Sequence, residues 1–192
     1  MNQRPPKSRI TDPALDQLRV PPHSIEAEQS ILGGLMLDNQ AWDRMGDLVT
    51  DTDFYRDEHR RIFRQIRTLL ERAKPADVVT VAEALDGAGE GDQTGGLAYL
   101  GELAANTPSS ANIRRYAEIV RERAVLRQLV ATADEIAADA LNPLGRDAET
   151  LLDEAESKIF KIAEAGAGHN EGFVHINPLL TQVVERIQEL HD

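Results

Sequence analysis

The chain has 192 residues, 41% of them hydrophobic, which suits one ordinary domain or a domain with an appendage and is too short for two large cores. Its 33 acidic and 21 basic residues give a net charge of -12, which argues against tight nucleic-acid binding by charge alone. The absence of cysteine excludes disulfides and thiolate metal sites, and with no signal peptide or long apolar run we expect a soluble, cytoplasmic protein without membrane contact.

The first half of the chain predicts a tail followed by a helical domain. Residues 1–22 are rich in proline and polar side chains, as in a disordered tail. From Ser24, a suitable N-cap, the apolar spacing becomes helical. Gly33 and Gly34 inside this first helix indicate the close approach of another backbone, or alternatively a kink. Residues 23–108 are expected to form a globular domain, with further helices over residues 40–49, 57–72, 80–87 and 97–104.

The helix predicted over residues 57–72 carries several basic side chains off its apolar stripe. They are Arg60, Arg61, Arg64 and Arg67. A solvated or ion-paired face is the favoured explanation and a binding patch the alternative, since charge runs on helices usually mean exposure. His59, on the same helix, is predicted to be a surface or helix-capping residue.

Residues 109–165 predict the longest element, an antiparallel helical hairpin that turns at residues 142–146. Apolar spacing predicts a seam of Leu126, Val130, Ala133, Ala137 and Ala140 against Leu152, Ala155, Ile159 and Ile162. The apolar residues left beside this seam are Leu129, Ile136, Leu151 and Phe160. Two helices cannot cover two faces by themselves, so we expect the second face to bury against the preceding helices, another copy or a partner.

The end of the chain predicts a tether and a terminal helix. Residues 166–176 are glycine-containing and are expected to be a flexible linker. Residues 177–192 begin with Asn177, a suitable cap, and Pro178, which suits a first helical turn. The apolar stripe of this helix consists of Leu180, Val183, Val184, Ile187 and Leu190. A helix this short is marginal alone in water, so it needs a surface to lie on.

No group of residues indicates an active site. The glycine-rich stretches lack the lysine of a phosphate-binding loop, and residues 87–96 add Glu90 and Asp92, which would repel a nucleotide. None of the five histidines pairs with another at metal-ligand spacing on a helix. Paired carboxylates are too common in this acidic chain to indicate a small hydrolase. We therefore expect no catalytic, cofactor-binding or metal-binding residues in this chain.

Four stretches taken together resemble the DnaB-type bacterial replicative helicase. They are PPHSIEAEQSILGGLMLDN, DFYRDEHRRIF, GGLAYLGELAANTPSSANIRRYAEIVRERAVLRQL and LLDEAESKIFKIAE. The likeness is colinear from about Val20 to Asp192 and covers the N-terminal domain and linker helix of that family. It implies a chain that ends where the family's ATPase domain would begin.

The resemblance implies a role that composition cannot show. In the family, six subunits form a ring, ATPase domains translocate 5′ to 3′ along one DNA strand, and the N-terminal domains pair through their hairpins into a collar that docks primase. For this chain it implies self-association as a dimer or hexameric ring, docking of the primase C-terminal domain, and contact with a helicase loader. ATP, Mg²⁺ and most DNA contacts are implied for the C-terminal domain alone. Residues 177–192 resemble the linker helix that lies on the neighbouring subunit's ATPase domain.

The residues expected to dock a partner are apolar or aromatic side chains of the hairpin and the helix before it. They are Tyr99, Leu129, Val130, Ile136 and Leu151. Internal packing is the alternative for each, above all for Tyr99, which lies among leucines at helical spacing. The alternative function is a freestanding all-helical adaptor, which would share the composition and the hairpin. The uncovered helix at residues 177–192 favours the helicase interpretation over the adaptor.

Overall fold

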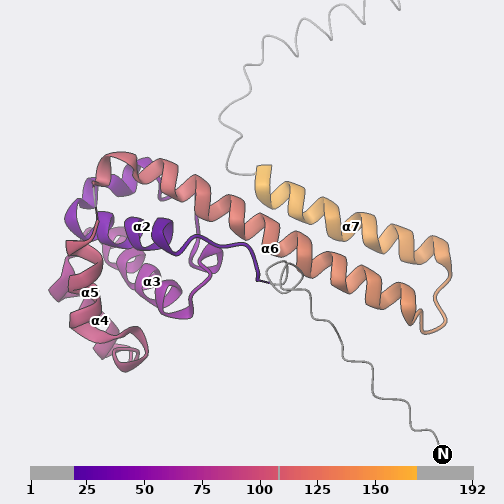
Figure 1. Cartoon of the computed structure of the whole chain (residues 1–192), viewed down its shortest axis with the longest axis horizontal. Helices are drawn as coiled ribbons and strands as arrows, with labels where there is room; N and C mark the ends of the chain where they lie inside the picture. The colour runs from indigo at the N-terminus through magenta and orange to yellow at the C-terminus, as the bar shows by residue number, and fades with distance from the viewer. Residues whose placement is uncertain (1–19, 108, 168–192) are drawn as a thin grey trace, which may run out of the picture. The chain divides into compact units, whose positions relative to one another are not determined.

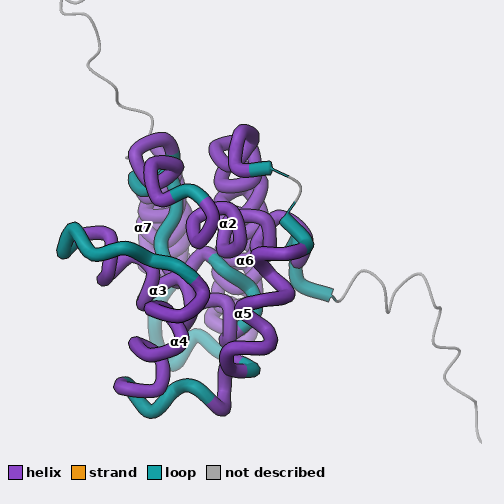
Figure 2. The backbone as a smooth tube through the Cα atoms, turned by 90° about the vertical axis from the view of Figure 1, so that its left-hand side faces the viewer, coloured by secondary structure: helices purple, strands orange, loops and turns teal. Residues whose placement is uncertain are grey.

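The computed structural model describes residues 20–107 and 109–167, and every regular element within them is a helix (Figures 1 and 2). The α-helices are α2 (Ile25–Leu37), α3 (Asp57–Glu71), α4 (Val78–Gly87), α5 (Gly96–Ala105), α6 (Ile113–Leu141) and α7 (Ala148–Ala167). Short 3-10 helices cover Asn39–Arg44, Asp51–Asp53, Asp92–Thr94 and Ser110–Asn112. The predicted all-helical class and the long hairpin are confirmed. The predicted tail and the residues of the predicted terminal helix lie outside the described residues, apart from the last positions of the tail.

Residue contacts divide the chain into two compact units, Met1–Asp134 and Glu135–Asp192. We call their described parts the globular unit, residues 20–134, and the hairpin unit, residues 135–167. The division lies inside α6, later than the position between residues 108 and 109 that sequence periodicity suggested. The physical reason is that the first half of α6 contributes Ile113, Ala117 and Val120 to the core of the globular unit.

Local capping explains where several helices begin. The Ser24 hydroxyl accepts a hydrogen bond from the Ala27 N–H at 3.3 Å, which confirms Ser24 as the cap of α2. The predicted start of α4 at Thr80 is wrong, because Asp77 caps the helix and accepts from the Val79 and Thr80 N–H groups at 2.9 Å each. The helix predicted over residues 40–49 is also wrong, since only the 3-10 helix Asn39–Arg44 forms there.

The core of the globular unit is built from one face of each helix. Figure 1 shows α2 to α5 gathered into one body. Its fully buried large side chains include Ile31, Leu32 and Leu35 of α2, Ile62, Phe63 and Ile66 of α3, Leu85 of α4, and Leu100 of α5. Phe54 packs on Phe63 with ring centroids 4.7 Å apart. The apolar stripes that the sequence predicts therefore converge on one core.

Gly33 lets α2 and α5 come together. A Cβ atom at Gly33 would lie 2.2 Å from the Leu103 carbonyl oxygen, whereas one at Gly34 would meet only side-chain and Cα atoms at 3.2 Å or more. The predicted close approach of another backbone is thus confirmed at Gly33. The contact brings the α2 backbone against Leu103 in the last turns of α5.

Three of the four arginines predicted on this face of α3 are ion-paired, and the fourth, Arg60, donates to the Phe54 carbonyl oxygen at 2.7 Å. Arg61 binds Asp57 at 2.7 Å and Glu90 at 2.9 Å, Arg64 binds Asp51 at 3.0 Å, and Arg67 binds Glu71 at 2.6 Å. These pairs confirm the ion-paired face that the sequence favoured over a binding patch. Most are exposed, so each contributes little to stability.

In the hairpin unit the last turns of α6 run antiparallel to α7 (Figure 1). Its contacts differ from the predicted seam, because Ile136 and Leu151 are half-buried whereas Leu152 is 70% exposed. The predicted assignment of Leu152 to the seam is therefore wrong. Lys158 explains the difference, since it pairs with Asp139 at 2.9 Å between the arms. A seam predicted from apolar residues alone does not include an ion pair such as Lys158 with Asp139.

The turn of the hairpin is held by charge. Arg146 binds Asp139 of α6 at 2.8 Å and Glu154 of α7 at 2.5 Å. Hydrogen bonds from Arg146 and Lys158 hold the pKa of the Asp139 carboxyl below its ordinary value of 3.8. The hydrogen bonds from Lys158 to Asp139 and, after it, to Glu135 raise the pKa of Lys158. Both directions favour the charged pair that joins the two arms.

Replacing Asp139 with asparagine is expected to loosen this turn at neutral pH. Because the folded-state pKa of Asp139 is depressed, its stabilisation is complete above the unfolded value of 3.8 and is lost as the pH falls through the folded value. Amide hydrogen exchange at residues 142–147 should therefore be faster in the variant near neutral pH and equal to wild type in strong acid. Asp153→Asn is the control, because Asp153 is an exposed carboxylate of α7. Equal effects of the two changes would contradict a stabilising role of Asp139 at the turn.

Candidate docking surfaces

Tyr99 of α5 is anchored inside the globular unit. Its hydroxyl lies 2.7 Å from His59 Nε2 and accepts a hydrogen bond from Gln29 Nε2 at 3.3 Å. The ring stacks parallel to His59 with centroids 6.0 Å apart. Its free side borders a cavity of about 220 Å³ that Glu26 and Glu102 also line. Tyr99 is thus half-buried, and a docking role for it stays a prediction that concerns this free side only.

The partner of Tyr99 belongs to a buried network that the sequence did not predict. Glu28 is 1% exposed and His59 is fully buried, so the prediction of a surface or capping histidine is wrong. The His59 Nδ1–H donates to Glu28 Oε2 at 2.7 Å, because a carboxylate can only accept. The backbone N–H groups of Tyr55 and Arg56 donate to the same carboxylate at 2.7 and 3.4 Å.

A signal for this network was present in the sequence. Glu28 lies seven residues before Leu35, and His59 lies seven residues before Ile66, so both polar residues stand on apolar helical stripes. Such a residue on a core-facing stripe needs a hydrogen-bonding partner. Periodicity shows that need, but it does not show which residue of another helix meets it.

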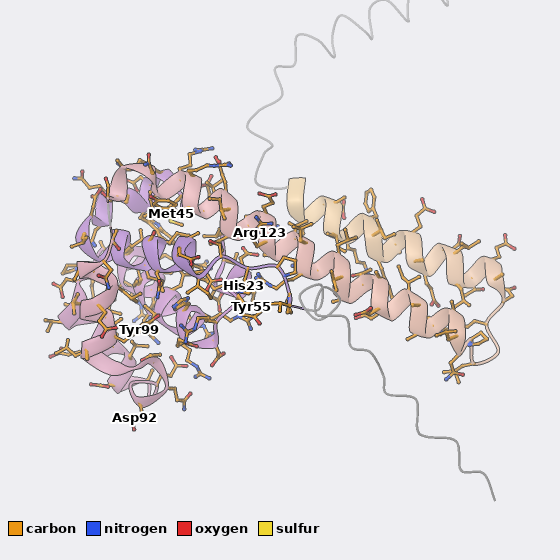
Figure 3. All side chains as sticks on the ribbon, viewed as in Figure 1. His23, Met45, Tyr55, Asp92, Tyr99 and Arg123 are labelled. Carbon is orange, nitrogen blue, oxygen red and sulfur yellow. The ribbon has the colours of Figure 1, made fainter. Side chains whose placement is uncertain are left out.

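A second cluster fixes the segment that enters α2. Figure 3 shows His23 beside Tyr55, and their rings stack at 4.3 Å with an interplanar angle of 10°. The Arg127 guanidinium lies 5.7 Å from the Tyr55 ring centroid and donates to the carbonyl oxygens of Pro22, at 2.7 Å, and of Asp53. Burial lowers the pKa of Arg127, against the opposing charge of Glu28. Arg127 therefore ties α6 to the start of the globular unit.

Two of the predicted docking residues lie exposed at the end of the globular unit. Leu129 is 45% exposed and Val130 is 51% exposed, and both belong to α6. They follow Ala124, the last buried residue of that helix in the globular core. Their side chains are therefore free for contact, and their docking role stays a prediction.

The other two predicted residues line a groove of the hairpin unit. Ile136 of α6 and Leu151 of α7 border a hollow of about 380 Å³ with a mostly apolar surface. Its remaining lining comes from both arms and consists of Asp139, Ala140, Ala148, Leu152, Glu154, Ala155 and Lys158. The structure thus brings these two predicted residues together.

Several predictions concern parts that the structure does not describe or features that it lacks. Leu180, Val183, Val184, Ile187 and Leu190 lie outside the described residues. Within residues 20–107 and 109–167, no three His, Asp or Glu side chains gather so as to hold a metal ion. Among the described helices, none is both long and apolar enough to cross a membrane.

Comparisons with known proteins agree on one family. Residues 20–122 match the family model of the DnaB-like helicase N terminal domain. The replicative DNA helicase DnaB of Haemophilus influenzae is 42% identical over 185 residues, which are 96% of this chain and 40% of that protein. DnaB of Geobacillus stearothermophilus is 38% identical over 174 residues, which are 91% of this chain and 38% of that protein. The chain therefore spans about 40% of the length of these relatives.

Solved structures show the same fold. The crystal structure of the N-terminal domain of DnaB helicase from Mycobacterium tuberculosis superposes with a TM-score of 0.71 at 36% identity, covering 74% of this chain and 99% of that one. The structure of a DnaB-like replicative helicase and its interactions with primase gives a TM-score of 0.59 at 20% identity, covering 83% of this chain and 34% of that one, a likeness of fold. The chain belongs to the family of DnaB-like helicase N-terminal domains.

Proposed function

We propose that this chain forms the N-terminal collar of a replicative helicase, where it self-associates through its hairpin and docks primase. The whole protein would be an ATP-dependent helicase that moves 5′ to 3′ on DNA at the cytoplasmic replication fork. ATP, Mg²⁺ and most DNA contacts would belong to the part of the relatives that this chain does not match. A loader and the neighbouring subunit's ATPase domain are the further partners that we propose, the latter for residues 177–192.

The apolar surface of the hairpin unit carries this proposal. Its large exposed side chains are Leu141 at 87%, Leu144 at 80%, Leu152 at 70%, Phe160 at 59% and Ile159 at 49%. So many exposed apolar residues on one short helical hairpin and its turn are unusual for a surface that meets only water. A groove lined by Ile136 and Leu151 adds a concave site between the arms. A partner helix with an apolar face fits such a groove.

Primase is the partner class that we propose for this surface. The structural neighbour at 20% identity was determined together with its interactions with primase, and it shares the fold described above. That likeness supports the fold, and the exposed hairpin supports the existence of a docking surface. The identity of the partner rests on the family, so it needs a direct test.

The test is the mass of the chain in solution, measured by light scattering over a concentration series with and without the C-terminal domain of the cognate primase. The proposal expects a dimer or larger ring that gains mass when primase is added. A strict monomer that ignores primase would contradict both parts of the proposal. Self-association without primase binding would contradict the docking part alone.

Leu152→Asp is expected to weaken self-association or primase binding by about tenfold or more, since burying an unpaired charge in an apolar interface costs at least 1.4 kcal/mol. Leu152 is 70% exposed, so helicity should stay unchanged. Leu97→Asp, at a leucine of α5 that is 56% exposed, is the matched control and should leave both masses unaltered. Ile136→Asp should weaken the same binding as Leu152→Asp. If the Ile136→Asp chain unfolds instead, Ile136 belongs to the internal packing of the hairpin.

A further inference from the structure

The groove of the hairpin unit has a mostly apolar surface, and the charged side chains that line it are ion-paired. Asp139 is bound by both Arg146 and Lys158, and Glu154 is bound by Arg146. The carboxylates that line the groove therefore demand no further cation. What remains is apolar surface from Ile136, Leu151 and neighbouring residues, which calls for an apolar occupant.

The sequence supplies such an occupant later in the same chain. Residues 177–192 carry five apolar side chains at helical spacing, from Leu180 to Leu190. The stripe from Leu180 to Leu190 spans ten residue steps, about 15 Å along a helix. The groove runs from Ala148 to Lys158 on α7, which is the same number of residues and hence the same length. A short amphipathic segment is stable as a helix only where its apolar stripe is covered.

The tether between the two is long enough for them to meet in one chain. From Ala167, the last residue of α7, back to Ala155 in the groove is twelve helical residues, or about 18 Å. Residues 168–176 can span up to about 30 Å when extended. A tether of this kind gives an effective concentration in the millimolar range, so a second copy competes only at similar concentrations.

We propose that residues 177–192 dock as a helix in the groove of their own hairpin, with the stripe from Leu180 to Leu190 against Ile136, Leu151 and Ala155. The proposal of this contact does not rest on the proposed function. One consequence rests on the proposed function: the docked segment covers the groove, so primase must displace it. The segment then occupies either the groove or the neighbouring subunit's ATPase domain.

Crosslinking in the full chain tests the contact, because the protein has no cysteine of its own. Ala155→Cys places a thiol at the middle of the groove, and Val184→Cys places one at the middle of the stripe, so the result does not depend on the direction of the docked helix. Glu185→Cys, on the opposite face of the segment, is the matched control. With a short thiol crosslinker at micromolar protein, the Ala155–Val184 pair should join within one chain at least about fivefold faster than the Ala155–Glu185 pair.

Equal rates for the two pairs would overturn the proposal, since they would show a segment without a preferred face. So would fast crosslinking between an Ala155→Cys chain and a Val184→Cys chain mixed at the same concentration, which would assign the groove to a second copy. Competition with primase is tested separately, by measuring whether added primase C-terminal domain slows the crosslinking of Ala155→Cys to Val184→Cys. Primase that binds nowhere would contradict the proposed function and leave the intramolecular contact as measured.

Discussion

Replacing Gly33 with alanine will lower the free energy of unfolding of the globular unit by about 3 kcal/mol or more, the upper range for overpacking a close-packed interior. The added Cβ would lie 2.0 Å from Thr107 Oγ1 and 2.2 Å from the Leu103 carbonyl oxygen. Because the second atom belongs to the backbone, no side-chain rotation relieves the collision, and α2 and α5 must move apart. Urea unfolding followed by circular dichroism measures the loss.

Gly101→Ala is the matched control for this change. Gly101 lies inside α5, and a Cβ there would meet no atom within 4 Å. Alanine should therefore raise the free energy of unfolding by up to about 1 kcal/mol, the difference in helix propensity. Adding Thr107→Ala to Gly33→Ala should restore only a small part of the loss, since the Leu103 carbonyl remains. A Gly33→Ala chain as stable as wild type would refute the close approach of the two helices.

Replacing Glu28 with alanine will destabilise the globular unit by about 2–3 kcal/mol, the cost of leaving a buried hydrogen-bonding group without its partner. The change leaves the Tyr55 and Arg56 N–H groups and the His59 ring without the acceptor that they share. His59 is fully buried, so its ring N–H cannot reach water to replace the hydrogen bond that it loses. Thermal and urea unfolding should both report the loss.

Glu26→Ala is the control for Glu28→Ala, because Glu26 belongs to the same first turns of α2 and is exposed. It should cost less than about 0.5 kcal/mol, as surface changes usually do. Should the Glu28→Ala chain not fold, Glu28→Gln keeps the shape and one acceptor oxygen and should give an intermediate, measurable loss. Equal stability of the Glu26 and Glu28 variants would show that the network contributes nothing.

Local features of the fold followed from residues that are neighbours in sequence. The Ser24 cap, the apolar stripe of α3, the end of α4 at Gly87 and the turn after α6 all depend on contacts within a few residues. The failures are local too. Sequence periodicity missed Asp77 as the cap of α4, because a valine pair follows it, and it read a full helix where only the 3-10 helix Asn39–Arg44 forms.

The candidate surfaces were predicted only in part. Ile136 and Leu151 were selected as apolar residues beyond the expected seam, and the structure brings them together in one groove. The predicted set of residues that face the opposite arm was partly wrong, because Lys158 and Asp139 join the arms as an ion pair. Adjacent positions on a helix differ by about 100°, so a small error in the seam exchanges covered and exposed leucines.

The sequence by itself determined the helical class, the approximate extent of the longer helices and the family, because periodicity, caps and a colinear resemblance all lie along the chain. Only the tertiary structure decided that Tyr99 joins the buried pair of Glu28 and His59 in one hydrogen-bonded network, and that α6 passes from the globular core into the hairpin. The physical reason is the separation of the partners. Glu28 and His59 are 31 residues apart, and His59 and Tyr99 are 40 apart. Each shows in sequence that it needs a polar partner, and only packing of the helices supplies that partner.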